Sequence, residues 1–272
     1  MATDPWSKSD SLDEAQLQVM VQRLEARATH PKFMAMLDEY LDAMGIDRAD
    51  RVIDLGCGTG VGTRAIVRRP GFQGSVVGVD LSPHLVEVAR QRAQADGTAD
   101  RAEFRAGDTT SLDIGDASFD AAIAQTLLSH VPDPAAVVRE AARVVRPGGM
   151  LGLFDADYAS LTFGHPDSAR GQAYDAVLSE AIVASPRVMR DMPRILATAG
   201  LERVATLSSV LAEVGTADYW ASAIEMLRRL VPSTGAMTES EMDAWAASQW
   251  TDAEAGVFFA ACTFYAYIAR RP

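Results

Sequence analysis

Three glycines at alternate positions follow a short apolar run, in the stretch Val52-Ile53-Asp54-Leu55-Gly56-Cys57-Gly58-Thr59-Gly60. Glycine permits positive φ angles and lets a ligand approach the main chain closely. Residues 61–69 can continue as a helix, whose first N–H groups are unpaired and carry partial positive charge. We therefore predict a strand, a turn and a helix that together hold the polar part of a nucleotide-like ligand.

Carboxylates at the ends of predicted strands extend this site. Asp80 can accept hydrogen bonds from both hydroxyls of a ribose, and Asp108 can accept one from an exocyclic amine. Asp54 can help to hold the turn or an ammonium group. S-adenosylmethionine (SAM) carries an amino acid end, a ribose and an adenine, so it would use all of these groups. The predicted cofactor-binding residues are Asp54, Gly56, Gly58, Gly60, Asp80, Leu81, Asp108, Thr109 and Gln125.

A nicotinamide-dependent oxidoreductase is the alternative on the same fold. Its fingerprint is G-x-G-x-x-G after the first strand, with an acid about 20 residues further on. Here the glycines have the spacing G-x-G-x-G and position 61 is Val. The third glycine of the dinucleotide fingerprint is therefore missing, which favours SAM.

A parallel sheet is needed to bring these residues together. The pattern predicts strands at 51–55, 75–80, 101–107, 119–125 and 150–154, with helices between them. Repeated βα units imply right-handed crossovers and helices on both faces. Ligands of such sheets lie outside the carboxyl ends of the strands.

The flanking segments are predicted to be mainly helical. We expect residues 1–10 to be disordered and a capping box to begin a helix at Ser11-x-x-Glu14, with a second helix over 31–44. After residue 155 we expect a long connection over 156–185 with a helix near 167–184, a crossover helix at 191–199, and a strand within 201–214. Helices should follow at 216–231, from Thr238 and from Thr251, before a terminal strand at 261–269.

At this point the chain resembles a known family. The run Asp54–Gly60, Asp80, Gly107-Asp108, Asp120 and Arg146-Pro147-Gly148-Gly149 are similar to the ordered motifs of class I SAM-dependent methyltransferases. The resemblance covers residues 48–156 tightly, and 191–214 and 258–272 more loosely. Leu128–Asp133 and Ala141–Gly149 are similar to the small-molecule and quinone-type branch, although that branch often has leucine where Ala142 stands.

The resemblance implies an α/β fold with a Rossmann-like seven-stranded sheet. The implied order is 3-2-1-4-5-7-6, with strand 7 antiparallel, helices on both faces and a helical cap. The expected division is N-terminal helices over the cofactor site (1–45), a SAM-binding core (46–156), a cap segment (157–190), the core continued (191–214), a helical cap insertion (215–258) and a final core strand (259–272).

Methyl transfer to a hydroxyl also needs a base. His130 lies a few residues past the fourth predicted strand, and Asp155 ends the fifth. A pair formed by His130 and Asp155 across the pocket would orient the imidazole and stabilise its charged form, and similar small-molecule O-methyltransferases place a His and an acid at matching points. Alternatively, His130 contacts the cofactor or caps the Asp133 helix, and Asp155 is a structural acid.

Other residues with reactive or charged side chains have simpler interpretations. Cys57 fills a small site in the turn. His30 and His84 are surface or helix-end residues, and His165 is solvated or packs in the cap. Arg27 either pairs with the cofactor carboxylate or is solvated. We expect no metal site, because Gln125 stands where catechol-type methyltransferases have an acid.

Composition limits the partners. The 272 residues carry a net charge of −12, and their Arg and Lys residues are scattered. This weighs against a nucleic acid substrate. Two cysteines without metal-ligand spacing suggest a reducing, cytoplasmic setting. No apolar run approaches the roughly 18 residues of a membrane helix.

A small organic substrate remains the best interpretation. The expected cap and the helix at 191–199 bring apolar and aromatic side chains that either line a pocket or form the core of the cap: Tyr158, Phe163, Tyr174, Met192, Trp220 and Met226. A SAM-binding protein that catalyses a cyclisation, or serves as a binding module, is the alternative. The oligomeric state stays open, with a homodimer as one option.

Overall fold

The computed structural model describes residues 4, 6 and 13–272. These residues form a seven-stranded sheet in the order β3-β2-β1-β4-β5-β7-β6, as predicted. Its strands are β1 (Arg51–Leu55), β2 (Ser75–Asp80), β3 (Ala102–Ala106), β4 (Phe119–Gln125), β5 (Val145–Phe163), β6 (Glu202–Gly215) and β7 (Phe258–Arg270). The pairs among β1 to β5 are parallel, whereas β7 runs antiparallel to both β5 and β6.

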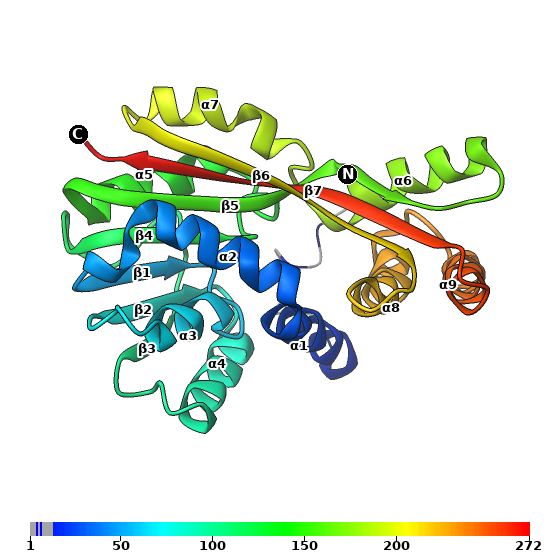
Figure 1. Cartoon of the computed structure of the whole chain (residues 1–272), viewed down its shortest axis with the longest axis horizontal. Helices are drawn as coiled ribbons and strands as arrows, with labels where there is room; N and C mark the ends of the chain where they lie inside the picture. The colour runs from blue at the N-terminus through cyan, green and yellow to red at the C-terminus, as the bar shows by residue number, and fades with distance from the viewer. Residues whose placement is uncertain (1–3, 5, 7–12) are drawn as a thin grey trace.

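Helices cover both faces of the sheet (Figure 1). The helices are α1 (Glu14–Thr29), α2 (Pro31–Met44), α3 (Val61–Arg68), α4 (Pro83–Ala95), α5 (Pro134–Val144), α6 (Ser168–Ile182), α7 (Val188–Thr198), α8 (Trp220–Leu230) and α9 (Glu239–Glu254). Neighbouring residues of β1 point to opposite faces: Val52 packs in the cluster with α2 and α3, and Ile53 in the cluster with α5 and α7. This is the alternation that a strand buried on both faces requires.

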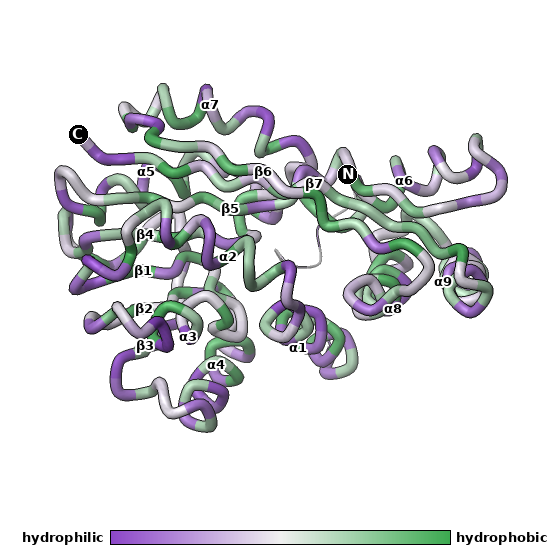
Figure 2. The backbone as a smooth tube through the Cα atoms, in the orientation of Figure 1, coloured by the Kyte–Doolittle hydropathy of each residue, from purple (hydrophilic) through white to green (hydrophobic). Residues whose placement is uncertain are grey.

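Strands β5 and β7 are longer than the sequence pattern predicts. We expected the fifth strand at 150–154 and a loop after it, but β5 continues to Phe163, and Ala156 and Asp157 still pair with β7. The three strands β5, β6 and β7 extend beyond the core towards α8 and α9 (Figure 1), and β7 carries hydrophobic residues along this path (Figure 2). The expected boundary at residue 156 therefore falls inside a continuous strand.

Two helix ends differ from the predicted capping boxes. The box expected at Ser11 and Glu14 lies partly outside the described residues; the observed cap of α1 is Asp13, whose side chain and that of Gln16 form a capping box. Thr238 and Glu241 form the predicted box of α9. The box predicted at Thr251 is wrong, because α9 continues to Glu254 and the Thr251 hydroxyl bonds the Ala247 carbonyl one turn earlier.

Candidate active site

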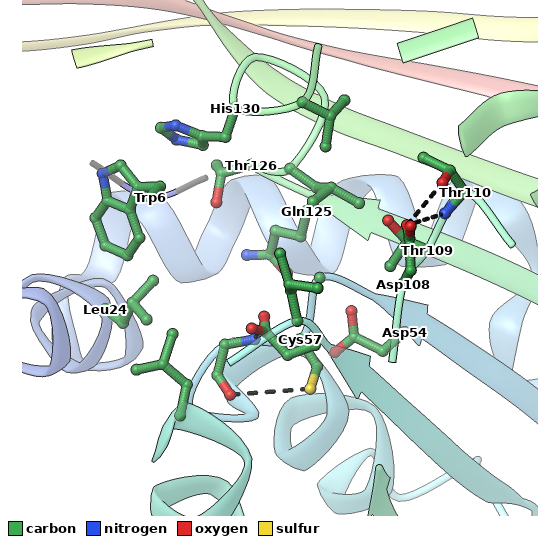
Figure 3. Close-up of a pocket in the computed structure, with 18 of the residues that line it drawn as sticks. Trp6, Leu24, Asp54, Cys57, Asp108, Thr109, Thr110, Gln125, Thr126 and His130 are labelled. Carbon is green, nitrogen blue, oxygen red and sulfur yellow. Dashed lines mark hydrogen bonds between the residues drawn. The ribbon is translucent and has the colours of Figure 1, made fainter. Parts of the chain in front are cut away.

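A cavity of about 600 Å³ lies at the carboxyl ends of β1, β2 and β4. The predicted cofactor residues that line it are Asp54, Gly56, Gly58, Asp80, Leu81, Asp108, Thr109 and Gln125, and His130 lines it too. Figure 3 shows His130 and Trp6 at one end and Asp54 and Asp108 towards the other. Gly60 and Asp155 do not line this cavity.

The glycine turn has the backbone that the sequence predicts. Gly56, Gly58 and Gly60 have φ angles of 66°, 55° and 80°, a region that other residues rarely adopt. A Cβ atom on Gly56 would stand 2.6 Å from Leu127 Cδ1, and one on Gly58 would stand 2.9 Å from Leu24 Cδ1. Glycine is therefore required both by the turn and by the space around it.

Asp80 ties the turn to the second strand. Its Oδ2 accepts a hydrogen bond from the Gly58 N–H at 2.8 Å, and its Oδ1 accepts one from the Ser82 N–H at 2.9 Å. Burial raises the pKa of this carboxyl. Asp108, by contrast, is exposed and accepts hydrogen bonds from the Thr110 N–H and hydroxyl at 2.8 and 2.7 Å. Both carboxylates border the cavity where the ribose and adenine were predicted.

Asp54 is the carboxylate with an unused oxygen. Its Oδ2 accepts a hydrogen bond from the Thr63 hydroxyl at 2.8 Å, and the side chain is buried. Its Oδ1 is buried without a hydrogen-bond partner among the described residues. Burial raises its pKa to about 7, because the charged form loses hydration that one hydroxyl does not replace. A cationic group of a ligand would stabilise the charged form.

His130 pairs with an acid that the sequence did not suggest. Its Nδ1 lies 2.9 Å from Asp4 Oδ2, and the imidazole ring lies 5.4 Å from the Trp6 ring between centroids. Asp4 is itself buried and accepts hydrogen bonds from the Trp6 and Ala184 backbone N–H groups. The expected disorder of residues 1–10 is thus wrong for Asp4 and Trp6, and the other eight positions lie outside the described residues.

Asp155 holds the loop that carries His130. It is completely buried and accepts hydrogen bonds from the Ser129 N–H at 2.9 Å, the Ser129 hydroxyl at 3.1 Å and the Ala156 N–H at 2.8 Å. Burial raises its pKa, and the neighbouring His130 acts in the opposite sense. The geometry therefore differs from the direct His130–Asp155 bond that we expected: Asp4 contacts the imidazole, and Asp155 fixes the preceding residue.

Arg27 and Thr126 both line the cavity. The sequence left the role of Arg27 open and assigned none to Thr126. Arg27 is buried rather than solvated, and its guanidinium donates to the Thr126 hydroxyl at 2.7 Å. Thr126 has a φ of 52°, a strained value for a β-branched residue. Its neighbour Gln125 accepts a hydrogen bond from the Tyr40 hydroxyl at 3.4 Å. The position of Thr126 directly after a strand-end residue was the only signal for it in the sequence.

The remaining candidates have structural roles. Burial raises the pKa of the Cys57 thiol well above its usual range, which makes it a poor nucleophile. His30 caps α2, as its helix-end interpretation predicted, and His84 and the His165 segment are at the surface. Among the described residues no cluster of three or more His, Cys, Asp or Glu side chains could hold a metal ion.

The aromatic and apolar residues that were expected near the substrate lie in three different places. Tyr158, Trp220 and Met226 line a second, small cavity beside the first. Phe163 packs edge-on against Trp220 and Trp245 in the cap core. Met192 was expected near the substrate. It is instead buried in the core cluster that α7 shares with α5, because α7 packs on the face of the sheet that α5 covers. Within the described part of the chain no helix is long and apolar enough to cross a bilayer.

The cavity fits the cofactor on these observations. Gly56 and Gly58 line the cavity with main chain that carries no side chain, and the unused Asp54 oxygen offers an acceptor for an ammonium group. Asp80 offers a carboxylate beside that turn, where ribose hydroxyls can donate to it.

Comparison with known proteins gives the same family. The model of a methyltransferase domain matches residues 53–153. The chain is 32% identical to an uncharacterized 37.1 kDa protein in transposon TN4556 of Streptomyces fradiae, over 92% of this chain and 71% of that protein. It is 38% identical to the 27-O-demethylrifamycin SV methyltransferase of Amycolatopsis mediterranei, over 44% of this chain and 43% of that enzyme.

A solved structure supports the fold. The [4+2]-cyclase SpnF superposes with a TM-score of 0.61 and 22% identity, over 88% of this chain and 82% of that one. The match to the rifamycin enzyme spans less than half of that protein. The motifs, the strand order and these matches agree, and the chain belongs to the class I SAM-dependent methyltransferases.

Proposed function

We propose that the protein transfers the methyl group of SAM to an oxygen of a small organic molecule, with His130 as the base. One observation carries this proposal: an imidazole in the wall of the cofactor cavity has its Nδ1 bonded to a carboxylate. A carboxylate oxygen accepts, so Nδ1 carries the hydrogen and Nε2 of the neutral ring is the acceptor. In the described part of the chain Nε2 has no hydrogen-bond partner.

The bound cofactor supplies a methyl group activated by an adjacent sulfonium. The chain has to hold it, orient the acceptor, exclude water and take one proton. Asp54 and Asp80 offer carboxylates for the ammonium and the ribose hydroxyls. His130 accepts the acceptor's proton at Nε2, and Asp4 holds the ring and stabilises the imidazolium that results. Asp155 is a positioning residue, because it fixes Ser129 next to His130.

A small organic acceptor suits the shape and lining of the site. The cavity wall near His130 includes the apolar side chains of Trp6, Leu127 and Val131. A cavity of about 600 Å³ has the size of an ordinary small-molecule site. The rifamycin relative is named for a methyl transfer to an oxygen of a small molecule, and this likeness supports oxygen as the accepting atom.

The base is tested by the pH profile of methyl transfer. We expect His130→Ala to lower kcat by about 10²–10⁴-fold, the usual contribution of a general base, and to remove one limb of the wild-type profile. Asp4→Asn should retain part of the rate, because the imidazole remains. An unchanged rate in His130→Ala across pH would refute the assignment.

The alternative is a SAM-binding protein that does not transfer the methyl group, such as a cyclase. Release of S-adenosylhomocysteine in proportion to product separates the two. Product formation without S-adenosylhomocysteine would favour the alternative.

A further inference from the structure

A second cavity, of about 20 Å³, lies between α1, α8 and the extended part of β5 and β7. It shares Trp6 and Arg27 with the wall of the larger cavity. Its lining combines two arginines with aromatic and apolar side chains: Trp6, Arg23, Arg27, Ala156, Tyr158, Leu161, Ile182, Trp220, Ala223, Met226, Leu227, Cys262 and Phe264. Among these described residues there is no aspartate or glutamate to balance the charge.

The two arginines are buried without a carboxylate partner. Arg23 and Arg27 are 4% and 6% exposed, and no ion pair to either is found among the described residues. Arg23 donates to the Tyr219 carbonyl and the Ser222 hydroxyl, both at 3.1 Å, and lies over the Tyr219 ring at 4.2 Å. These contacts position the guanidinium but bring no negative charge.

Three N–H groups of this wall have no acceptor. They are Arg23 Nε, Arg27 Nε and Trp220 Nε1, each buried and without a hydrogen-bond partner in the part of the chain that the structure describes. All three residues line the small cavity. A buried donor without a partner costs about 1–3 kcal/mol, and more when it is charged. The Tyr219 hydroxyl is close enough to act on both arginines, but it is neutral, and three buried donors in one wall indicate that an anionic acceptor fits there.

The placement of the two charges adds to this cost. Arg23 and Arg27 are four residues apart on α1, so they share one face of the helix and repel each other. Burial lowers the pKa of the Arg23 guanidinium, and the nearby Arg27 charge acts in the same direction. The pKa of Arg27 is instead raised, because the effect of its burial is outweighed by Tyr219, Tyr158 and Asp155 together. Arg23 is therefore the less compensated of the two. Buried charges are normally paired, and an anion between these side chains would compensate both of them.

We propose that this cavity binds a carboxylate group of the methyl acceptor, held by Arg23 and Trp220 with Arg27 between the two cavities. This inference rests on the proposed function and names its substrate class: an apolar molecule with a carboxylate and a separate methylatable hydroxyl. A volume of about 20 Å³ holds only a small group, since a water molecule needs roughly 10–15 Å³ on this measure. The planar guanidinium fork matches the two oxygens of a carboxylate.

The reacting end of the same molecule would lie in the larger cavity. The Tyr158 ring, in the wall of the small cavity, is 6.0 Å from the His130 ring. Tyr158 therefore lies between the wall of the small cavity and the proposed base. Arg27 borders both cavities and can also face the carboxylate of the cofactor, whereas Arg23 and Trp220 line only the small one. These two residues consequently provide the specific test.

The test uses small probes of which only the polar head group has to enter the small cavity. Protein saturated with S-adenosylhomocysteine is titrated with butyrate, with n-butanol and with monobutyl phosphate, while the indole N–H signals of the four tryptophans are followed by NMR. The Trp220 signal is identified by its loss in Trp220→Phe. We expect a saturable shift of this signal with butyrate and none with butanol.

Variants separate anion binding from a general effect on the fold. Arg23→Met should weaken butyrate binding at least tenfold. The matched control is Arg229→Met on the neighbouring α8, where the arginine side chain is 57% exposed and pairs with Glu225; it should bind butyrate as the wild type does. If Arg23→Met does not fold, Trp220→Phe gives the second test by calorimetry, with an expected loss of about 10–100-fold, the size of one hydrogen bond to a charged group.

Three results would overturn the proposal: the same shift with butanol as with butyrate, equal butyrate binding by Arg23→Met and Arg229→Met, or tighter binding of monobutyl phosphate than of butyrate. The titration does not depend on catalysis. If butyrate binds as expected but no small molecule of the host is methylated from labelled SAM, the proposed function fails while the anion site stands. If methyl transfer occurs and butyrate does not bind, the anion site alone is refuted.

Discussion

We predict that the affinity for SAM depends on pH through Asp54. Its pKa in the free protein is raised to about 7 by burial, and its Oδ1 is without a partner within the described residues. The proposed partner of Oδ1 is the ammonium group of the cofactor, which favours the ionised carboxylate. Below pH 7 the free protein therefore holds a proton that binding must release.

The size of the effect follows from this pKa. A carboxyl with a pKa of about 7 is about one tenth ionised at pH 6, so the dissociation constant should fall about tenfold for each pH unit up to about 7, or about 1.4 kcal/mol per unit. Above pH 7 the dependence on Asp54 should disappear. Asp54→Asn can still accept the Thr63 hydrogen bond but removes the titration, so its weaker binding should not change with pH.

The raised pKa of Asp54 also makes the free energy of unfolding depend on pH. An unfolded Asp has a pKa of about 3.9, so a folded pKa of about 7 means that folding favours the protonated form. This stability is fully present below about pH 4 and is lost as pH rises to about 7, by about 4 kcal/mol in total. Asp54→Asn should therefore gain stability relative to the wild type across this window.

Calorimetric titration with SAM between pH 5.5 and 7.0 tests this reasoning, because an α-amino group stays protonated there. Measurements in two buffers of different ionisation enthalpy should show release of close to one proton at pH 5.5 in the wild type. Urea unfolding of both proteins over pH 4.5–7.5 provides the stability comparison. An affinity that is flat over pH 5.5–7.0, or one that changes equally in Asp54→Asn, would refute the reasoning.

Three further changes test the turn, the loop and the cap. Gly56→Ala places a Cβ atom 2.6 Å from Leu127 on a residue whose φ is 66°. It should lower the free energy of unfolding in urea by at least about 1–2 kcal/mol and weaken SAM binding in equilibrium dialysis. Unchanged binding would contradict the fit of the turn to the cofactor. Ser129→Ala removes one of the Asp155 hydrogen bonds and should lower the free energy of unfolding by about 1–3 kcal/mol. It should also lower kcat more than it changes the KM for SAM, and a change in KM alone would refute the positioning role. Thr238→Ala breaks the capping box of α9 and should lower the free energy of unfolding by about 0.5–2 kcal/mol. The affinity for SAM should not change, and a loss of affinity of the same size would contradict the independence of the cap from the cofactor site.

The gathering of the proposed cofactor residues around one cavity was predictable from the sequence. Gly56, Gly58, Asp80 and Asp108 end or follow strands of a repeated βα pattern, and the carboxyl ends of parallel strands meet at one edge of a sheet. Local spacing and sheet topology are enough to bring such residues together, so their positions around the cavity required no knowledge of long-range packing.

The contacts around the proposed base and the cap were less predictable. Asp4 and His130 are 126 positions apart in the sequence. The polar N-terminal segment contains no pattern that predicts a contact between them. The extension of β5 past Phe154 depends on pairing with β7, a partner about a hundred residues away. The burial of Arg23 and Arg27 could not be predicted either, because arginine on an amphipathic helix is usually solvated.

The central claim is methyl transfer from SAM to a small organic molecule. The most direct measurement incubates the protein with methyl-labelled SAM and the small-molecule fraction of its host, and then quantifies label and S-adenosylhomocysteine together. The account predicts label in an organic acid product, S-adenosylhomocysteine in equal amount, and loss of both in His130→Ala. Label that remains entirely in SAM, although the protein binds SAM, would contradict it.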